Sequence, residues 1–120
     1  MNYLVSKRIP NAEAFLEHCE RITMKSKSVV FRQGELSQDF YVILEGSVSV
    51  IVDDVEDSEQ EMVVSYLNPG EFFGEMGLFG EETRTANLVT RTPCVFAKIS
   101  YEDFHAIRQR YPDVLYALTS

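Results

Sequence analysis

The 120-residue chain is poor in several residue types: it has no tryptophan, two histidines and two cysteines, and 11 basic residues against 19 acidic ones. The net charge of −8 argues against nucleic-acid binding by this segment, because such domains normally present a basic face. Two cysteines outside any C-x-x-C motif are too few for a disulfide scaffold and indicate free thiols in a reducing compartment. Because no apolar run approaches the roughly 18 residues of a membrane span, we expect a cytoplasmic protein without membrane contact.

The shortage of histidine also bears on catalysis. A metal site in a small β-barrel enzyme of the cupin kind commonly uses two or three histidines, whereas His18 and His105 each fall in a helix expected near one end of the chain. The same two histidines would have to activate any serine or cysteine nucleophile. The phosphate loops G-K-[ST] and G-x-G-x-x-G are absent. We therefore expect no enzyme and no metal site, and a metal analysis would test the cupin alternative.

Short β patterns separated by turn signals fill the centre of the chain. They cover residues 28–31, 40–44, 47–52, 62–67, 86–90 and 94–99. The second and third flank Glu45-Gly46, which predicts a hairpin, and the acidic segment 53–60 is typical of a solvated loop between strands. Helices are expected at 11–19, with Asn11 as N-cap, at 100–110, and from Pro112 onward. The pattern favours a mainly β sandwich, roll or barrel in one domain, with short flanking helices.

One stretch, GEFFGEMGLFGEETRTANL at 70–88, holds four of the six glycines and a single arginine. Gly74 allows close approach of the backbone to a ligand, and residues 75–79 suffice for one helical turn whose first N–H groups favour an anion. Arg84 is suited to a bidentate contact with a phosphate, and Thr85 adds a hydroxyl donor.

Glu75 is the exception in this stretch, since a carboxylate beside a phosphate is repulsive. It fits if it accepts hydrogen bonds from hydroxyl groups such as those of a ribose, and a phosphate together with a sugar describes a nucleotide. On spacing alone, an intramolecular ion pair between Glu75 and Arg84 that closes a surface loop is equally consistent.

Residues 74–79, GEMGLF, followed by Arg84-Thr85-Ala86, resemble the phosphate-binding cassette of cyclic nucleotide-binding domains. Segments 40–48, 65–72 and 99–101 are also similar to that family, so the likeness extends over residues 11–118. The bacterial cyclic AMP receptor branch is the most similar part of the family. The resemblance implies a double-stranded β-helix, a jelly-roll-like β-roll, with a ligand pocket inside it.

The resemblance also assigns expected roles to residues. Glu75 would bind the ribose 2′-hydroxyl, with the backbone of Gly74 and Met76 lining the same edge. Arg84 would pair with the cyclic phosphate, and Thr85 would donate a hydrogen bond to it.

Further candidates complete the expected ligand-binding set. Ala86 completes the cassette, and Val50, Val64 and Ser65 match positions on the strand wall near the sugar and base. For these three wall residues, an ordinary place in the core is an equally good interpretation.

The implied function is allosteric rather than catalytic, with cAMP as the expected ligand. Thr85, in place of the serine usual in the closest branch, keeps cGMP open, and a cyclic dinucleotide, no ligand, or the regulatory domain of a kinase or channel remain alternatives. Residues 1–120 would form one domain, with a long helix starting near 112 and cut at Ser120. In the family that helix carries the homodimer contact and leads to a helix-turn-helix, so the whole protein is expected to bind DNA while this segment does not contact it.

Overall fold

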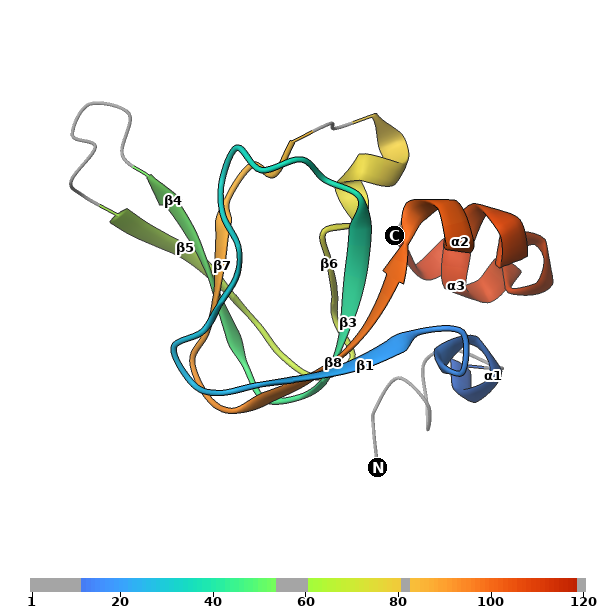
Figure 1. Ribbon diagram of the computed structural model, residues 1–120, viewed down its shortest axis with the longest axis horizontal. Helices are drawn as coiled ribbons and strands as arrows, with labels where there is room; N and C mark the ends of the chain where they lie inside the picture. Colours follow the sequence, from blue (N-terminus) through green and yellow to red (C-terminus); the bar gives the residue numbers. More distant parts are fainter. Residues whose placement is uncertain (1–11, 54–60, 81–82, 119–120) are drawn as a thin grey trace.

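The computed structural model describes residues 12–53, 61–80 and 83–118 (Figure 1). Its strands are β1 (Glu20–Met24), β2 (Val29–Phe31), β3 (Asp39–Glu45), β4 (Val48–Asp53), β5 (Glu61–Leu67), β6 (Phe72–Phe73), β7 (Asn87–Thr90) and β8 (Cys94–Ser100). Its helices are α1 (Ala12–Leu16), α2 (Tyr101–Ile107) and α3 (Pro112–Leu118), with 3-10 turns η2 (Glu75–Phe79) and η3 (Arg108–Arg110).

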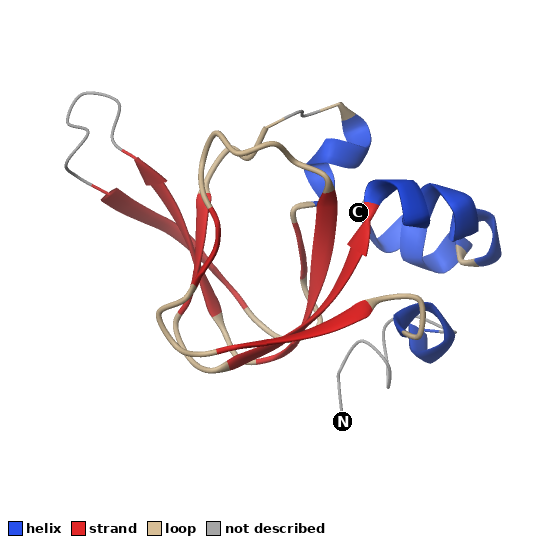
Figure 2. Cartoon of the chain, viewed as in Figure 1, coloured by secondary structure: helices blue, strands red, loops and turns tan. Residues whose placement is uncertain are grey.

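The strands form two four-stranded antiparallel sheets, in the orders β1-β8-β3-β6 and β2-β7-β4-β5. Early strands pair with late ones, so the chain winds as a double ribbon that closes into a roll. The three α-helices gather beside the first sheet, whereas η2 lies at one mouth of the roll (Figure 2). This arrangement confirms the predicted mainly β roll with short flanking helices.

The predicted hairpin between residues 40–44 and 47–52 is wrong, because β3 and β4 belong to different sheets. Gly46, at φ +90°, redirects the chain from one sheet to the other, and a Cβ there would lie 2.4 Å from the carbonyl oxygen of Pro93. The hairpin lies one strand later, where β4 pairs with β5 down to Asp53 opposite Glu61. Residues 54–60 of the expected acidic loop lie outside the described residues.

Strand β3 serves two cores, because alternate side chains point to opposite faces of a sheet. Phe40 and Val42 face the helices and pack with a cluster that includes Phe15, Phe104 and Val114. Tyr41 and Ile43 face the interior of the roll and pack with Phe31, Phe73 and Phe96. The prediction of a buried strand at 40–44 is therefore confirmed for four of its five positions, 40–43.

The ends of the helices follow from local chemistry. Ser100 caps α2 by accepting a hydrogen bond from the backbone N–H of Asp103 at 3.0 Å, as its spacing predicted. Helix α1 ends at Leu16, three residues before the predicted end, and strand β1 was missed by the sequence analysis. Its residues are mostly exposed and lack a regular apolar alternation. The expected N-cap, Asn11, lies outside the described residues.

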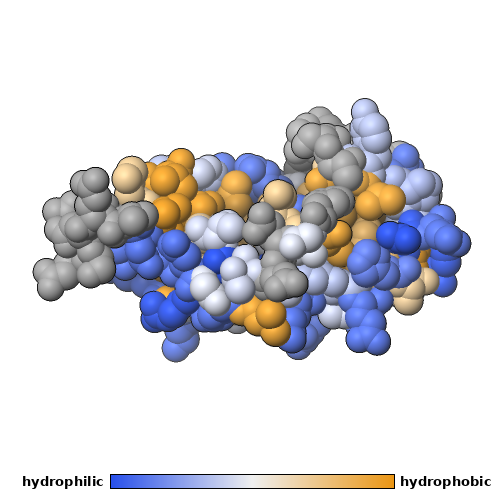
Figure 3. Space-filling view, turned by 90° about the horizontal axis from the view of Figure 1, so that it is seen from above, coloured by the Kyte–Doolittle hydropathy of each residue, from blue (hydrophilic) through white to orange (hydrophobic). Residues whose placement is uncertain are grey.

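Strand β5 is the edge of its sheet and buries little. Met62, Val63, Val64 and Tyr66 are 47–57% exposed. Apolar surface beside the grey end of the β4–β5 hairpin is visible from above (Figure 3). This strand therefore projects from the roll rather than enclosing it.

Candidate functional site

Gly74 joins β6 to η2 and brings the backbone against the arginine of the cassette. It has φ +80°, in the left-handed region that suits glycine. A Cβ at this position would lie 2.7 Å from Nη1 of Arg84 and 3.2 Å from the carbonyl oxygen of Asp39. The site therefore requires glycine here both for the backbone angle and for space. The predicted short helical turn follows directly as η2.

Arg84 is the buried cation of the site, with only 7% of its surface exposed. Its backbone is anchored on both sides, since its N–H donates to the carbonyl of Glu35 and its carbonyl accepts from Gly34, each at 2.8 Å. Its guanidinium carbon lies 4.1 Å from the centre of the Phe31 ring, a cation–π contact. The arginine is thus fixed in place before any ligand arrives.

Both terminal nitrogens of the Arg84 guanidinium are already hydrogen-bonded. Nη1 donates to the carbonyl of Gly74 at 3.1 Å and to the hydroxyl of Tyr101 at 3.3 Å. Nη2 donates to the carbonyl and to the carboxylate Oδ1 of Asp39, both at 2.8 Å. The intramolecular ion pair of the arginine is therefore with Asp39 and not with Glu75, so the simple Glu75–Arg84 pair is not formed.

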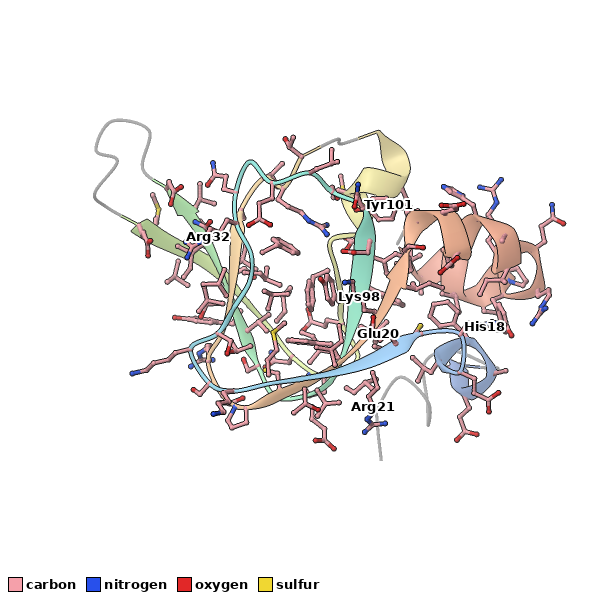
Figure 4. The ribbon with its side chains drawn as sticks, viewed as in Figure 1. His18, Glu20, Arg21, Arg32, Lys98 and Tyr101 are labelled. Atoms are coloured by element: carbon pink, nitrogen blue, oxygen red, sulfur yellow. The ribbon has the colours of Figure 1, made fainter. Side chains whose placement is uncertain are left out.

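Tyr101 links the cassette to the helices. It is the first residue of α2 and lies beside η2 (Figure 4). Its hydroxyl donates to the carbonyl of Gly74 and is hydrogen-bonded to Ser37. Gly77 of η2 packs directly on the ring, because a Cβ there would lie 2.4 Å from it. Any movement of the cassette is therefore transmitted to the start of α2.

Two buried polar atoms of the site have no hydrogen-bond partner among the described residues: Nε of Arg84 and Oε2 of Glu75. Buried polar atoms are nearly always paired, so a donor and an acceptor left open together call for an explanation. Both residues line the same cavity. A ligand that offers an anionic acceptor to Arg84 and a hydroxyl donor to Glu75 satisfies both atoms.

The cavity has a volume of about 230 Å³ and lies within the roll beside η2. Seven of the nine predicted site residues line it: Val50, Gly74, Glu75, Met76, Arg84, Thr85 and Ala86. Val64 and Ser65 do not, because they sit on the projecting part of β5, where Val64 is 53% exposed. Leu67, at the end of β5, lines the wall instead.

Sequence reasoning missed several members of the site. Ser37, Phe31, Phe73 and Leu88 also line the cavity, and Asp39 holds the arginine from behind. Only Asp39 left a usable signal, as an acidic residue placed directly before a wholly apolar strand. Its role depends on β3 lying beside the cassette, which the wrong hairpin pairing concealed.

A second cation reaches Asp39 from β8. Nζ of Lys98 lies 3.5 Å from Oδ2 of Asp39, so the carboxylate stands between two positive groups (Figure 4). Tyr41, in register with Lys98, has its pKa raised to about 12, first by burial and then by the negative charge of Asp39. The phenol therefore stays neutral and adds no charge to this network at ordinary pH.

Within the described part of the chain, no three or more His, Cys, Asp or Glu side chains are grouped to hold a metal ion. None of the helices described is long and apolar enough to cross a membrane.

The fold and site together define a β-roll domain that binds a small ligand through a glycine-led cassette. The family model of the cyclic nucleotide-binding domain matches residues 21–111, and the chain belongs to that family. The resemblance found in the sequence is thereby confirmed.

Individual relatives agree with this placement. The chain is 44% identical over 112 residues to the cAMP-activated global transcriptional regulator CRP of Salmonella typhimurium, covering 92% of this chain and 52% of that protein. It is similar to the structure of the c-di-GMP-responsive global regulator CLP of Xanthomonas campestris, with 39% identity and a TM-score of 0.80 over 91% of this chain and 55% of that one. The Thermus thermophilus catabolite activator protein gives 29% identity and a TM-score of 0.83 over 97% and 54%. The chain spans about half the length of the curated relatives it matches.

Proposed function

We propose that this chain is the effector-binding domain of a cyclic-nucleotide-responsive transcription regulator and that its ligand is cAMP. The observation that carries the proposal is the pair of unpartnered buried atoms, Nε of Arg84 and Oε2 of Glu75, on the wall of one cavity. A cyclic phosphate accepts from the first, and the ribose 2′-hydroxyl donates to the second. A nucleoside 3′,5′-cyclic phosphate carries both groups in one rigid molecule.

The remaining cassette residues act around these two contacts. The backbone of Gly74 and Met76 lines the ribose edge, and Thr85 adds a hydroxyl donor to the phosphate. Ala86 and Val50 form the apolar wall near the sugar and base. Because Tyr101 bonds Gly74 and begins α2, occupation of the cassette biases the position of the helices.

The choice among ligands rests on similarity and on size. The relative from Salmonella is described as cAMP-activated, whereas CLP is described as c-di-GMP-responsive, so a cyclic dinucleotide is the second candidate. The cavity of about 230 Å³ is below the roughly 300–1,000 Å³ of sites for drug-sized ligands, which favours one nucleotide over two. Thr85 is compatible with cGMP as well as cAMP.

The proposal extends to the whole protein. Residues 1–120 form its sensor domain, and the helix that begins at Pro112 continues as the long helix of a homodimer and leads to a DNA-binding domain. This segment itself binds cyclic nucleotide and contacts neither DNA nor membrane, catalyses no reaction and works in the cytoplasm. The length and description of the Salmonella relative support this extension.

The test is calorimetric titration of the purified chain with cAMP, cGMP and c-di-GMP, using Arg84→Ala as the variant. Loss of a charge-assisted hydrogen bond of about 1.5–3 kcal/mol should weaken cAMP binding roughly ten- to a hundredfold. Arg91→Ala is the matched control, because Arg91 is exposed and stacks on Tyr66 outside the cavity. Unchanged cAMP affinity in a folded Arg84→Ala protein would refute the assignment, and a thermal melt verifies folding.

A further inference from the structure

The Arg84 guanidinium meets its ligand with its terminal donors already in use. Nη1 is bonded to Gly74 and Tyr101, and Nη2 to the carbonyl and carboxylate of Asp39. Only the Nε–H is unpartnered. A bidentate phosphate contact needs two guanidinium N–H groups, so a phosphate can obtain its second one only by displacing an existing acceptor.

Among these acceptors, the Asp39 carboxylate is the exchangeable one. The two carbonyl acceptors belong to the backbone of β3 and of the turn before η2, and they cannot leave without moving those segments. The carboxylate is a side chain, and its exposed fraction of 20% exceeds the 5% of the arginine side chain. It also carries the negative charge that an incoming phosphate would bring.

Lys98 provides a place for the displaced carboxylate. Its Nζ lies 3.5 Å from Oδ2 of Asp39, on the oxygen that Arg84 does not use. The lysine side chain is 32% exposed and projects from β8, so it is free to tighten this contact. When Arg84 turns to a phosphate, Asp39 therefore keeps a cationic partner and is not left as an unpaired charge, which would be costly in a partly buried site.

We propose that Asp39 is a resident counter-ion of the binding site: it occupies Arg84 in the empty state, is displaced by the ligand phosphate, and passes to Lys98. This inference rests on the proposed function, since it concerns the phosphate of the same ligand. Asp39 then sets the affinity of the site, because part of the binding free energy is used to release it. Two opposite effects follow, one on the empty protein and one on ligand binding.

Asp39→Asn separates this role from simple support of the arginine. Asparagine keeps the shape of the side chain, the backbone carbonyl and an oxygen that accepts from Nη2, so Arg84 stays in place. The empty protein loses an ion pair and should melt at a slightly lower temperature. Affinity for cAMP should nevertheless rise roughly three- to thirtyfold, because a neutral amide is displaced more readily than a carboxylate. A residue that merely positioned Arg84 would lower both quantities.

Lys98→Met tests the second half of the exchange. With Asp39 present, loss of the lysine should weaken cAMP binding several-fold, since the released carboxylate has no partner. In the Asp39→Asn background the same substitution should have a much smaller effect, and this difference is the coupling measured by a double-mutant cycle. Asp113→Asn, an exposed residue at the start of α3, is the control for the change in net charge.

The experiment titrates the wild-type chain and these variants with cAMP, cGMP and c-di-GMP by calorimetry, with a thermal melt of each empty protein. Tighter binding by Asp39→Asn, with Asp113→Asn unchanged, is the expected result. If the wild type binds a cyclic nucleotide and Asp39→Asn binds it no more tightly, the counter-ion role is refuted while the proposed function stands. If neither protein binds any of the three, the proposed function fails and the inference with it. Should Asp39→Asn not fold, Asp39→Ser, which also keeps the carbonyl, is subject to the same criteria.

Discussion

Replacing Gly74 with alanine should impair ligand binding far more than its effect on stability alone would suggest. At φ +80° an L-residue is strained by about 1–2 kcal/mol, which lowers the melting temperature of a domain of this size by roughly 3–10 °C. The added Cβ would also lie 2.7 Å from Nη1 of Arg84. The guanidinium must move away, and its Nε–H then no longer faces the cavity in the same way.

We therefore expect Gly74→Ala to weaken cAMP binding roughly tenfold or more, a loss comparable with that of the arginine contact itself. Gly34→Ala and Gly80→Ala are the controls, because these glycines have φ +90° and +114° but no heavy atom within 4 Å of the would-be Cβ. They should lose stability to a similar extent and retain affinity. Calorimetry with parallel melts of the three variants measures both quantities. Equal loss of affinity in all three would show that the steric contact with Arg84 is unimportant.

Two further predictions concern single side chains. Glu75→Gln should weaken binding of cAMP more than of 2′-deoxy-cAMP, because the open Oε2 is assigned to the 2′-hydroxyl, and equal losses measured by calorimetry would contradict the sugar contact. Burial raises the pKa of the Cys19 thiol from 9.0 to about 12, so its thiolate is scarce at pH 8 in the folded chain and is gained only as pH rises toward 12. Iodoacetamide at pH 8, read by peptide mass spectrometry, should therefore label Cys19 on the order of a hundredfold faster in urea than in the native protein. Similar rates in both would refute the shift.

The parts of the site that were predictable from sequence are those close together along the chain. Gly74, Glu75 and Arg84 fall within eleven residues, so the chemistry of a phosphate beside a hydroxyl could be inferred from types and spacing. The turn η2 followed from the same stretch. Asp39 could not be inferred, because its contact with Arg84 exists only when β3 pairs with β6, with Tyr41 opposite Phe73.

The errors in the fold have the same origin. The segments flanking Gly46 have the local pattern of a hairpin, and only the long-range pairing of β3 with β8 separates them. Val64 was assigned to the wall because it alternates like a core residue, yet β5 is an edge strand with solvent on both faces. Whether an apolar strand residue is buried depends on what covers it, and that information is absent from its own segment.

The winding of the strands has a consequence for how the domain reaches its native state. Glu20 pairs with Lys98 and Val29 with Val89, so the sheets bring together positions about 60 to 80 residues apart in the chain. Such closures must be made before their contacts stabilise the chain, which places the domain among slow folders, with refolding times on the order of milliseconds to seconds. Only β4 and β5 form a local pair. During synthesis, β1 and β2 consequently wait with unpaired edges until β7 and β8 have left the ribosome.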